Sequence, residues 1–408
     1  MTATLRFGPP LPAPIMRDVR TRMIFEHFKY DPQVSDHPLL VEYPLLLPRP
    51  EWERIARCAE QLSRELLAAE AELCRRPALH KTLGLPKPIA RLWSRGAPDR
   101  TRDARVMRFD FHLTDDGWRI SECNCDTPGG YNEAVGFACL MQQHTPGTAL
   151  AANPAQMLSD AIADAVPEGA HVAMIYPTSF VEDQQILLFL RQYLEARGLT
   201  THLASAAHLT WANGRVTLAN AVETVPVDAI VRYYPAEWLP SLRRSTRWQD
   251  FFTQAAPPAS NPTTALLTQS KRFPLTWDAL QTPMDAWREM LPATVDVRSI
   301  PQPKWREWVL KPVYGRFGED IAIPGVASEK LWRSAEKSAR RRPGEWIAQK
   351  PFIAIPLTNP HGETVYPSVG VYTVNARVAG IYGRLSRTPI VDSTARDLAI
   401  LIKEEETL

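Results

Sequence analysis

Cysteine is scarce in this chain. Only five occur in 408 residues, namely Cys58, Cys74, Cys123, Cys125 and Cys139, and no two form a Cys-x-x-Cys pair. An odd number without metal-type spacing argues against a disulfide framework and against a zinc site. Cys123 and Cys125 fall on the apolar side of a predicted strand. We therefore interpret them as buried free thiols of a protein in the reducing cytoplasm.

The chain also has no large excess of positive or negative charge. It contains 47 Lys and Arg and 45 Asp and Glu, so its formal net charge is +2. This balance gives no indication of a nucleic-acid partner. No apolar run approaches the length of a membrane helix, and residues 1–23 lack the apolar core of a signal peptide. We expect a cytoplasmic protein with small-molecule partners and without nucleic-acid or membrane partners. The oligomeric state stays open, with a homodimer among the options.

The length exceeds that of a typical single domain and predicts two or three lobes. The middle of the chain predicts a small parallel α/β lobe, because strands and a helix alternate there. This lobe lacks a Gly-x-Gly-x-x-Gly turn, so we expect no dinucleotide site in it. Helical spacing predicts helices near 16–29, 51–76, 132–142 and 181–197. Apolar runs predict strands at 171–176, 200–203, 229–233, 307–311, 346–350, 368–374 and 378–384, the last two as a hairpin joined by 375–377.

A pair of strands around residues 108–126 carries the main chemical signal. A three-residue loop over Asp115, Asp116 and Gly117, with the glycine left-handed, would pair Asp110 with Glu122 and Arg108 with Asn124. A two-residue Asp-Gly turn would instead pair Asp110 with Cys123 and mix the two faces. With the three-residue loop, one face holds two carboxylates, an amide oxygen and an arginine.

That face suits Mg²⁺, which prefers oxygen ligands and takes one or two carboxylates together with nucleotide phosphates. Directly opposed carboxylates repel each other unless a cation lies between them. The alternative interpretation is the solvent-exposed face of an ordinary hairpin, and the hairpin alone does not separate the two.

A second cluster follows the strand at 307–311. Lys311 ends that strand, and a loop containing Gly315, Arg316 and Gly318 comes next. A lysine beside flexible glycines suits polyphosphate, although glycine turns after strands are common. Two weaker signals are Lys271 on a predicted loop and Gln349 at the end of an apolar strand.

Together these segments resemble the synthetase domain of the glutathionylspermidine synthase family, whose members are ATP-grasp ligases. The similarity is collinear over about residues 105–390. It rests on Arg108-Phe109-Asp110, Glu122-Cys123-Asn124-Cys125-Asp126-Thr127-Pro128, Tyr234-Pro235-Ala236-Glu237-Trp238-Leu239, Lys271, Lys311-Pro312-x-x-Gly315-Arg316-x-Gly318, Gln349 and Gly370…Gly380…Arg384.

The resemblance implies an α/β (α+β) protein with an ATP-grasp fold in permuted order and a small Rossmann-like parallel α/β lobe. The implied division is an N-terminal helical and irregular segment (1–104), a metal-binding hairpin with its following helix (105–150), the parallel lobe (151–245), and the ATP-grasp lid and core (246–408). Residues 307–384 with the glycine loop are the implied lid.

The resemblance also implies a role for each site residue, with ATP and Mg²⁺ as cofactors. Mg²⁺ would be held by Asp110, Glu122 and Asn124. ATP would be held by Lys271, Lys311, Gly315, Gly318 and Gln349, the last near the adenine. The implied catalytic residues are Arg108, Arg316 and Arg384.

The implied activity is an ATP-dependent carboxylate–amine ligase that forms an amide through an acyl phosphate. A non-catalytic nucleotide-binding or scaffold protein and an ATP-dependent phosphotransferase remain alternatives. The loop sequence Gly-Arg-Phe-Gly-Glu-Asp-Ile, the Gly129-Gly130-Tyr131 segment and the C-terminal end depart from the family pattern. These departures leave the acid and the amine unidentified.

Overall fold

The computed structural model describes residues 5–31, 33–34, 37–98, 100, 103–315, 318 and 320–404. A six-stranded sheet lies at its centre, in the order β21-β20-β19-β5-β6 with β18 pairing to β19. Its strands are β5 (Val106–Thr114), β6 (Gly117–Asn124), β18 (Leu357–Thr358), β19 (Thr364–Val374), β20 (Arg377–Ser386) and β21 (Arg396–Leu398).

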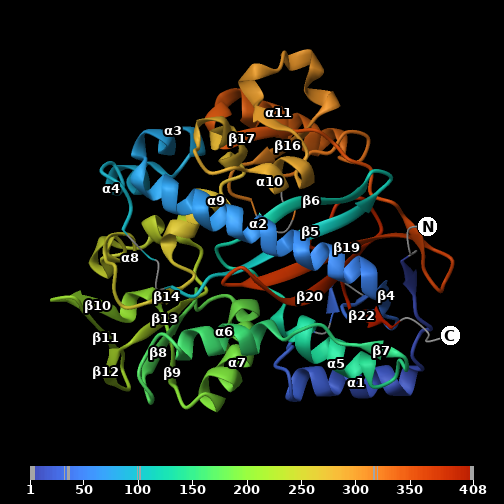
Figure 1. The fold of residues 1–408 in the computed structure, drawn as a ribbon, viewed down its shortest axis with the longest axis horizontal. Coiled ribbons are helices and arrows are strands. Elements are labelled where there is room, and N and C mark those ends of the chain that lie inside the picture. Colours follow the sequence, from blue (N-terminus) through green and yellow to red (C-terminus); the bar gives the residue numbers. More distant parts are fainter. Residues whose placement is uncertain are drawn as a thin grey trace.

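The long helix α2 (Arg49–Arg75) crosses one face of this sheet (Figure 1). It confirms the helix predicted at 51–76. Ile55, Leu62, Leu66 and Leu73 recur at helical spacing and are all 0% exposed. This stripe packs against strand residues such as Phe109 and Val371 in one apolar core. The amphipathic pattern thus fixes which side of the central sheet is closed to solvent.

The predicted parallel lobe is confirmed. Its four strands run in the order β14-β13-β8-β9, and each adjacent pair is parallel. They are β8 (His171–Ile175), β9 (Thr200–Ala204), β13 (Ala229–Arg232) and β14 (Ala259–Ser260). Helices α6 (Pro154–Ala163) and α7 (Val181–Ala196) share its core. A small antiparallel sheet adjoins it, formed by β10 (Leu209–Ala212), β11 (Arg215–Ala219) and β12 (Thr224–Val227).

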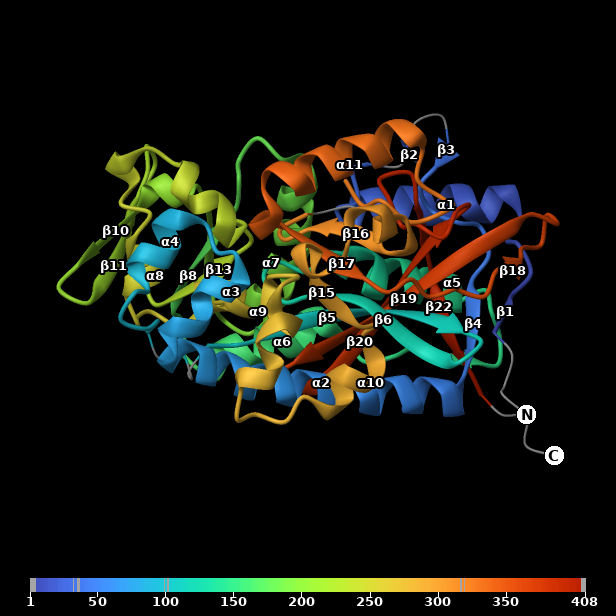
Figure 2. The same cartoon turned by 90° about the horizontal axis from the view of Figure 1, so that it is seen from above.

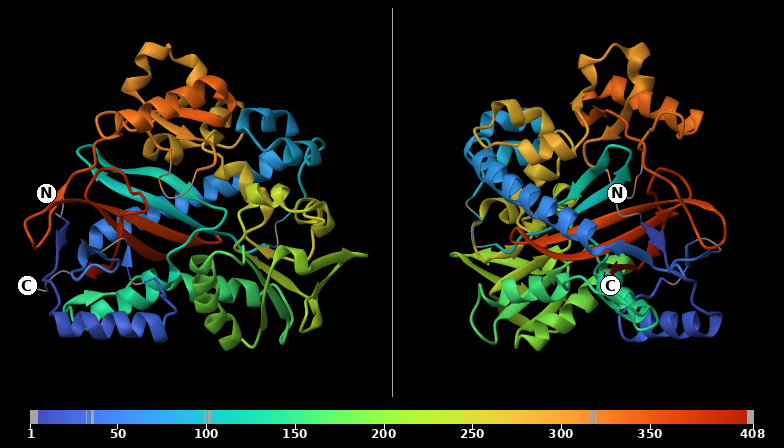
Figure 3. Two further views of the ribbon diagram at one scale, coloured as in Figure 1. Left: turned by 180° about the vertical axis from the view of Figure 1, so that it is seen from behind. Right: turned by 45° about the vertical axis from the view of Figure 1, so that its right-hand side comes forward.

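A third lobe carries the predicted strands at 307–311 and 346–350. Its sheet has the order β15-β17-β16, with β15 (Thr294–Asp296), β16 (Val309–Pro312) and β17 (Trp346–Gln349), and α11 (Glu329–Arg341) packs on it. Seen from above, this lobe lies over β5 and β6 (Figure 2). The parallel lobe and the α11 lobe stand on opposite sides of the central sheet in both views of Figure 3.

The remaining elements are short or peripheral. A mixed sheet joins β1 (Arg6–Phe7), β4 (Leu45–Pro48), β22 (Ile400–Lys403) and β7 (Thr148–Ala149), and β2 (Gln33–Val34) pairs with β3 (His37–Pro38). The other helices are α1 (Ala13–Phe25), α3 (His80–Leu83), α4 (Lys87–Leu92), α5 (Ala138–Gln142), α8 (Asp250–Thr253), α9 (Leu266–Gln269) and α10 (Asp285–Met290). The helix predicted at 132–142 begins as a π-helical segment, Asn132–Phe137. Among the described residues, no helix combines the length and apolar composition that a membrane span needs.

The predicted pairing of β5 with β6, the two strands that carry the predicted metal ligands and are called the chemical strands below, is confirmed, but the predicted loop between them is wrong. Asp110 lies opposite Glu122, and Arg108 lies opposite Asn124. The turn, however, contains two residues, because Thr114 pairs directly with Gly117. A β-bulge between these two regions shifts the register by one residue and restores the predicted pairs. Gly117 is left-handed as expected, with φ +92°.

The hairpin predicted at 368–384 also has a different role from the one expected. It is longer, and its strand β19 pairs with β5 from Val369 to Val374, placing Gly370 opposite Asp110. The hairpin therefore belongs to the platform that carries the chemical strands, and its assignment to a lid is wrong.

Glu72 at the end of α2 ties this helix to the loop before α10. Its carboxylate accepts hydrogen bonds from the backbone N–H groups of Gln281 and Thr282 at 2.8 and 2.9 Å. Burial by itself opposes ionisation, but these bonds and Arg76 outweigh it and lower the pKa of Glu72 to about 2. The charged form thus stabilises the folded state above pH 4.5, and this contribution is lost as the pH falls towards 2.

We expect Glu72→Gln to lower the free energy of unfolding near pH 7 by about 1–3 kcal/mol, since charge-assisted hydrogen bonds are lost. Urea unfolding at neutral pH measures this. The exposed Glu53→Gln on the same helix is the matched control and should change stability by less than about 0.5 kcal/mol. Equal effects of the two substitutions would show that the loop contacts of Glu72 do not contribute.

Candidate active site

The predicted metal ligands gather on one face of β5 and β6. Arg108 holds Asp110 through two contacts, Nε to Oδ1 at 2.7 Å and Nη2 to Oδ2 at 3.0 Å. The Asn124 amide donates to Asp110 Oδ2 at 3.0 Å. Glu122 on β6 lies opposite Asp110 on β5, and its carboxylate lies 3.3 Å from the Lys271 ammonium. The opposed carboxylates are thus neutralised by cationic side chains from two directions.

This donor set fits a hard divalent cation. Within the described part of the chain, no group of three His, Cys, Asp or Glu side chains could hold a metal ion. A metal at this face would therefore combine the carboxylates of Asp110 and Glu122 with the amide oxygen of Asn124. Such a set leaves coordination positions for phosphate oxygens and water, which is how Mg²⁺ binds in nucleotide sites.

Two lysines approach this face from different elements. The Lys311 ammonium, on β16, donates to the backbone carbonyl of Ser121 at 3.1 Å. Lys271 donates to the carbonyl of Gly315 at 3.1 Å. Lys271 was predicted on a loop, and it lies in the turn after α9, where its backbone N–H donates to the Val313 carbonyl and links the turn to the end of β16.

Burial and mutual repulsion govern the charges here. Burial lowers the pKa of Lys311 to about 8, with Lys271 acting in the same direction and Glu122 opposing them. Burial would raise the pKa of Glu122, but the two lysines outweigh it and hold this pKa below its ordinary value. Glu122 is consequently ionised at neutral pH and carries the negative charge that both lysines share.

A cavity of about 690 Å³ opens in front of this face. It brings together most of the predicted site residues, which are Arg108, Asp110, Glu122, Asn124, Lys311, Gly315, Gly318, Gln349 and Arg384. Lys271 lines a smaller cavity of about 40 Å³ that shares Glu122, Lys311 and Gln349 with the larger one. Arg316 lies outside the described residues.

The ends of the cavity differ in character. Val309, Ile321 and Ile323 give one end an apolar wall beside Gln349, whose amide donates to Thr294 Oγ1 at 3.0 Å. A flat base would find apolar contacts and a polar edge at this end. Gly318 nearby has φ +68°, and a Cβ there would come within 2.6 Å of the Val391 carbonyl, so this position requires glycine.

The opposite end contains residues that sequence reasoning missed. Lys29 forms ion pairs with Asp31, Glu133 and Asp397. Asp397 in turn accepts a hydrogen bond from the Tyr382 hydroxyl at 2.9 Å. These residues come from distant segments without a shared motif, so no local pattern could have revealed them. Their meeting in ion pairs is visible only in the folded protein.

Two of the three predicted arginines, Arg108 and Arg384, contact residues at this end of the cavity. The Arg108 guanidinium lies 5.0 Å from the centre of the Tyr382 ring and donates to the Gly129 carbonyl at 2.8 Å. A Cβ at Gly370 would lie 2.8 Å from Arg108 Cδ, so glycine makes room for this side chain. Arg384 donates to the Ala395 carbonyl at 2.7 Å. Both arginines therefore lie at the cavity with fixed orientations.

The family profile of the glutathionylspermidine synthase preATP-grasp proteins matches residues 16–403. The chain belongs to this family. Membership indicates an ATP-dependent ligase in general terms. A search of curated protein sequences finds no match.

Among solved structures, the chain is similar to a glutathione synthetase-like effector from Globodera pallida in its apo form. The TM-score is 0.64 at 13% identity, and the match covers 96% of this chain and 98% of the other. This similarity shows the fold, which is that of ATP-grasp-like synthetases. A putative gamma-glutamylcysteine synthetase from Methylobacillus flagellatus KT matches with a TM-score of 0.44 and 12% identity, over 80% of this chain and 83% of the other.

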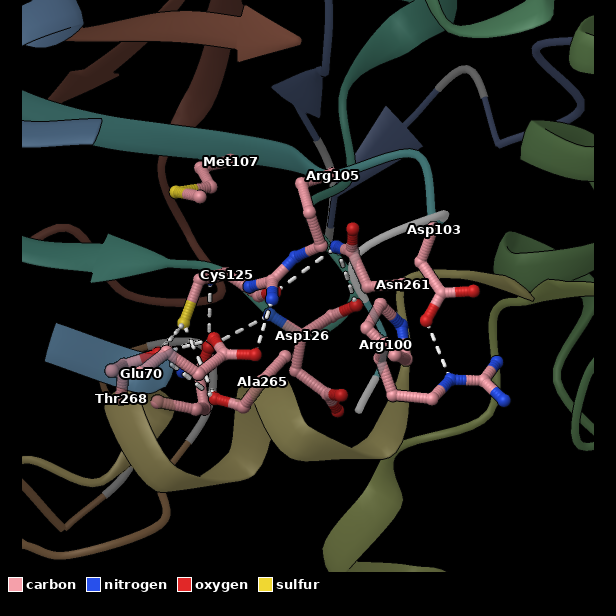
Figure 4. A network of polar contacts seen from close by, with 12 residues as sticks. Glu70, Arg100, Asp103, Arg105, Met107, Cys125, Asp126, Asn261, Ala265 and Thr268 are labelled. Carbon is pink, nitrogen blue, oxygen red and sulfur yellow. Dashed lines mark hydrogen bonds and ion pairs between the residues drawn. The ribbon is translucent and has the colours of Figure 1, made fainter. Parts of the chain in front are cut away.

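In this member of the glutathionylspermidine synthase preATP-grasp family, the Asp126 of the motif after β6 is structural. It is 1% exposed, its carboxylate contacts Arg232 on β13, and it accepts the N–H of Ala236 at 3.0 Å. Asn261 next to it donates to the carbonyls of Val106, Cys125 and Asp126. Figure 4 shows Asp126 and Asn261 of this network together with Glu70 of α2 and Arg105, which also pair. The network joins the parallel lobe to the chemical strands.

Proposed function

We propose that this protein is a carboxylate–amine ligase that uses ATP to form an amide through an acyl phosphate. The observation that carries the proposal is the two-carboxylate face of Asp110 and Glu122 with Lys271 and Lys311 beside it, at two cavities that share Glu122 and Lys311. A carboxylate does not condense with an amine at neutral pH, whereas an acyl phosphate does.

The phosphoryl transfer needs charge neutralisation and alignment more than a protein nucleophile. The substrate carboxylate oxygen attacks the γ-phosphorus, and ADP leaves. Lys271 and Lys311 hold the phosphate oxygens. When bound at Asp110, Glu122 and Asn124, Mg²⁺ supplies further neutralisation of the phosphates.

In the second step the amine nitrogen attacks the acyl carbon, and inorganic phosphate leaves with its bonding electron pair while the nitrogen loses a proton. Negative charge collects on the acyl oxygen and the departing phosphate. Arg108 and Arg384, which are half-buried at the cavity, are the cationic groups that stabilise it. The acyl phosphate must be shielded from water, which would otherwise hydrolyse it.

The test is a screen of acids and amines for magnesium-dependent ADP formation with mass detection of the product. ADP release that needs both an acid and an amine, with a product lighter than their sum by one water, supports the ligase. ADP release with a phosphorylated product would identify a phosphotransferase instead. Absence of ADP with every pair would contradict the proposal.

Arg316, between the glycines of the loop, supports a further prediction. Replacement by Lys keeps the charge but loses the planar fork that binds two phosphate oxygens at once. We expect Arg316→Lys to lower kcat about tenfold or more while KM for ATP changes little, because the fork acts on charge that develops during transfer. Steady-state kinetics measures this. A raised KM with an unchanged kcat would make Arg316 a ground-state ATP ligand.

A further inference from the structure

The bulge in β6 resolves a conflict of side-chain direction. Trp118 and Ile120 point into the core, whereas Glu122 and Asn124 line the cavity. All four occupy even positions, so a regular strand would place them on the same face. Phe111 pairs with Ile120 and Asp110 with Glu122, which leaves Ser121 as the extra residue without a partner of its own.

The opposite directions of Ile120 and Glu122 do not by themselves require an extra residue at Ser121. A strand that lacked Ser121 would alternate regularly from Ile120 to Glu122 and would keep the same pairs with β5. An extra residue that unpairs part of the ladder therefore needs a second reason, and its contacts supply one.

Both polar groups of Ser121 are used at the cavity. Its carbonyl, released from the ladder, accepts the hydrogen bond from Lys311 Nζ at 3.1 Å. Its hydroxyl lies 3.1 Å from His112 Nε2 and 3.5 Å from the Asp110 carbonyl. His112 is itself fixed, since it is 6% exposed and its ring packs 5.3 Å from that of Phe352.

Lys311 depends on this acceptor. Its side chain is 6% exposed, and an ammonium in such a place needs an acceptor to keep its charge and its direction. The Ser121 carbonyl holds it beside the carboxylate face. The Ser121–His112 contact fixes the angle of that carbonyl, because it ties the bulge to the neighbouring strand.

We propose that Ser121 and His112 are positioning residues that aim Lys311 at the phosphate position beside the Asp110–Glu122 face. The proposal deepens the ligase function and rests on it for the identity of the phosphate. Neither residue transfers a group or touches the reacting atoms. Their effect on ATP passes through Lys311.

The test compares Ser121→Ala, Ser121→Thr and His112→Phe with wild type. Threonine restores the hydroxyl and suits a strand, and phenylalanine keeps the ring against Phe352 without the nitrogen. Ser159→Ala is the matched control, since Ser159 is also a buried serine but lies in α6. The first measurement is acetic anhydride labelling of Lys311 without nucleotide, quantified by peptide mass mapping. The second is the Kd of ATP in the presence of Mg²⁺.

We expect Ser121→Ala and His112→Phe each to increase Lys311 labelling several-fold and to weaken ATP binding about tenfold, as loss of supporting contacts typically does. The double variant should be no worse than either single variant, because both break one contact. Threonine should restore both values, and Ser159→Ala should leave them unchanged.

Wild-type labelling and ATP affinity in Ser121→Ala would overturn the proposal, as would failure of threonine to restore them. Additive effects in the double variant would also contradict it. If wild type bound no ATP, the ligase proposal would fail, whereas the labelling result would still decide whether Ser121 positions Lys311.

Discussion

Replacement of Glu122 by Gln is expected to reduce magnesium-dependent ATP turnover by about two to three orders of magnitude. The amide keeps the shape of the side chain but removes one of the two carboxylates, and with it a strong ligand for Mg²⁺. It also removes the charge that Lys271 contacts at 3.3 Å. ADP release over a range of Mg²⁺ concentrations measures the effect, and circular dichroism checks that the fold survives.

Glu168→Gln provides the control for this substitution, because Glu168 is exposed and does not line the cavity. It should turn over ATP as wild type does. Excess Mg²⁺ should recover part of the Glu122→Gln activity if the loss lies in metal affinity. Undiminished turnover in Glu122→Gln would show that the metal face is wrongly assigned.

Replacement of Lys311 by Met is expected to abolish most of the stabilisation that ATP gives the folded protein. A ligand that binds only the native state at about 100 times its Kd stabilises it by about 2.7 kcal/mol. Methionine keeps the apolar stem of this buried residue and removes the ammonium that points at the carboxylate face. The shift in Tm on addition of ATP, measured for each variant against its own ligand-free Tm, isolates binding from intrinsic stability.

Lys304→Met is the matched control, since Lys304 is exposed and lies outside the cavity lining. Its ATP-induced shift should equal that of wild type. An equal shift in Lys311→Met would remove Lys311 from the nucleotide site and leave Lys271 as the remaining lysine of the cluster.

The elements with strong periodic signals could be predicted from the sequence. The stripe of Ile55, Leu62, Leu66 and Leu73 predicted α2 to within two residues at each end. Apolar runs predicted β8, β9 and β13, and the strand–helix–strand order at 171–203 predicted the parallel lobe. Such signals are local, because burial of one face repeats along the chain with the period of the element itself.

One error arose where a non-local contact decided the structure. The hairpin predicted at 368–384 was expected in a lid, but the pairing of its strand β19 with β5 places it in the central sheet. Strand pairing is chosen by the burial of whole faces, which no segment reveals alone.

The sequence by itself determined which chemical groups this protein carries. It predicted that Asp110 and Glu122 share one face, but from a loop that the structure does not have. The tertiary structure alone decided how the pairing arises, since the bulge at Ser121, not a longer turn, sets it. It also decided which groups surround the two arginines, because Lys29, Tyr382 and Asp397 come from segments far apart in the chain. Local alternation gives side-chain direction only where a strand is regular, whereas a bulge and the meeting of distant buried charges depend on how the strands and the core pack.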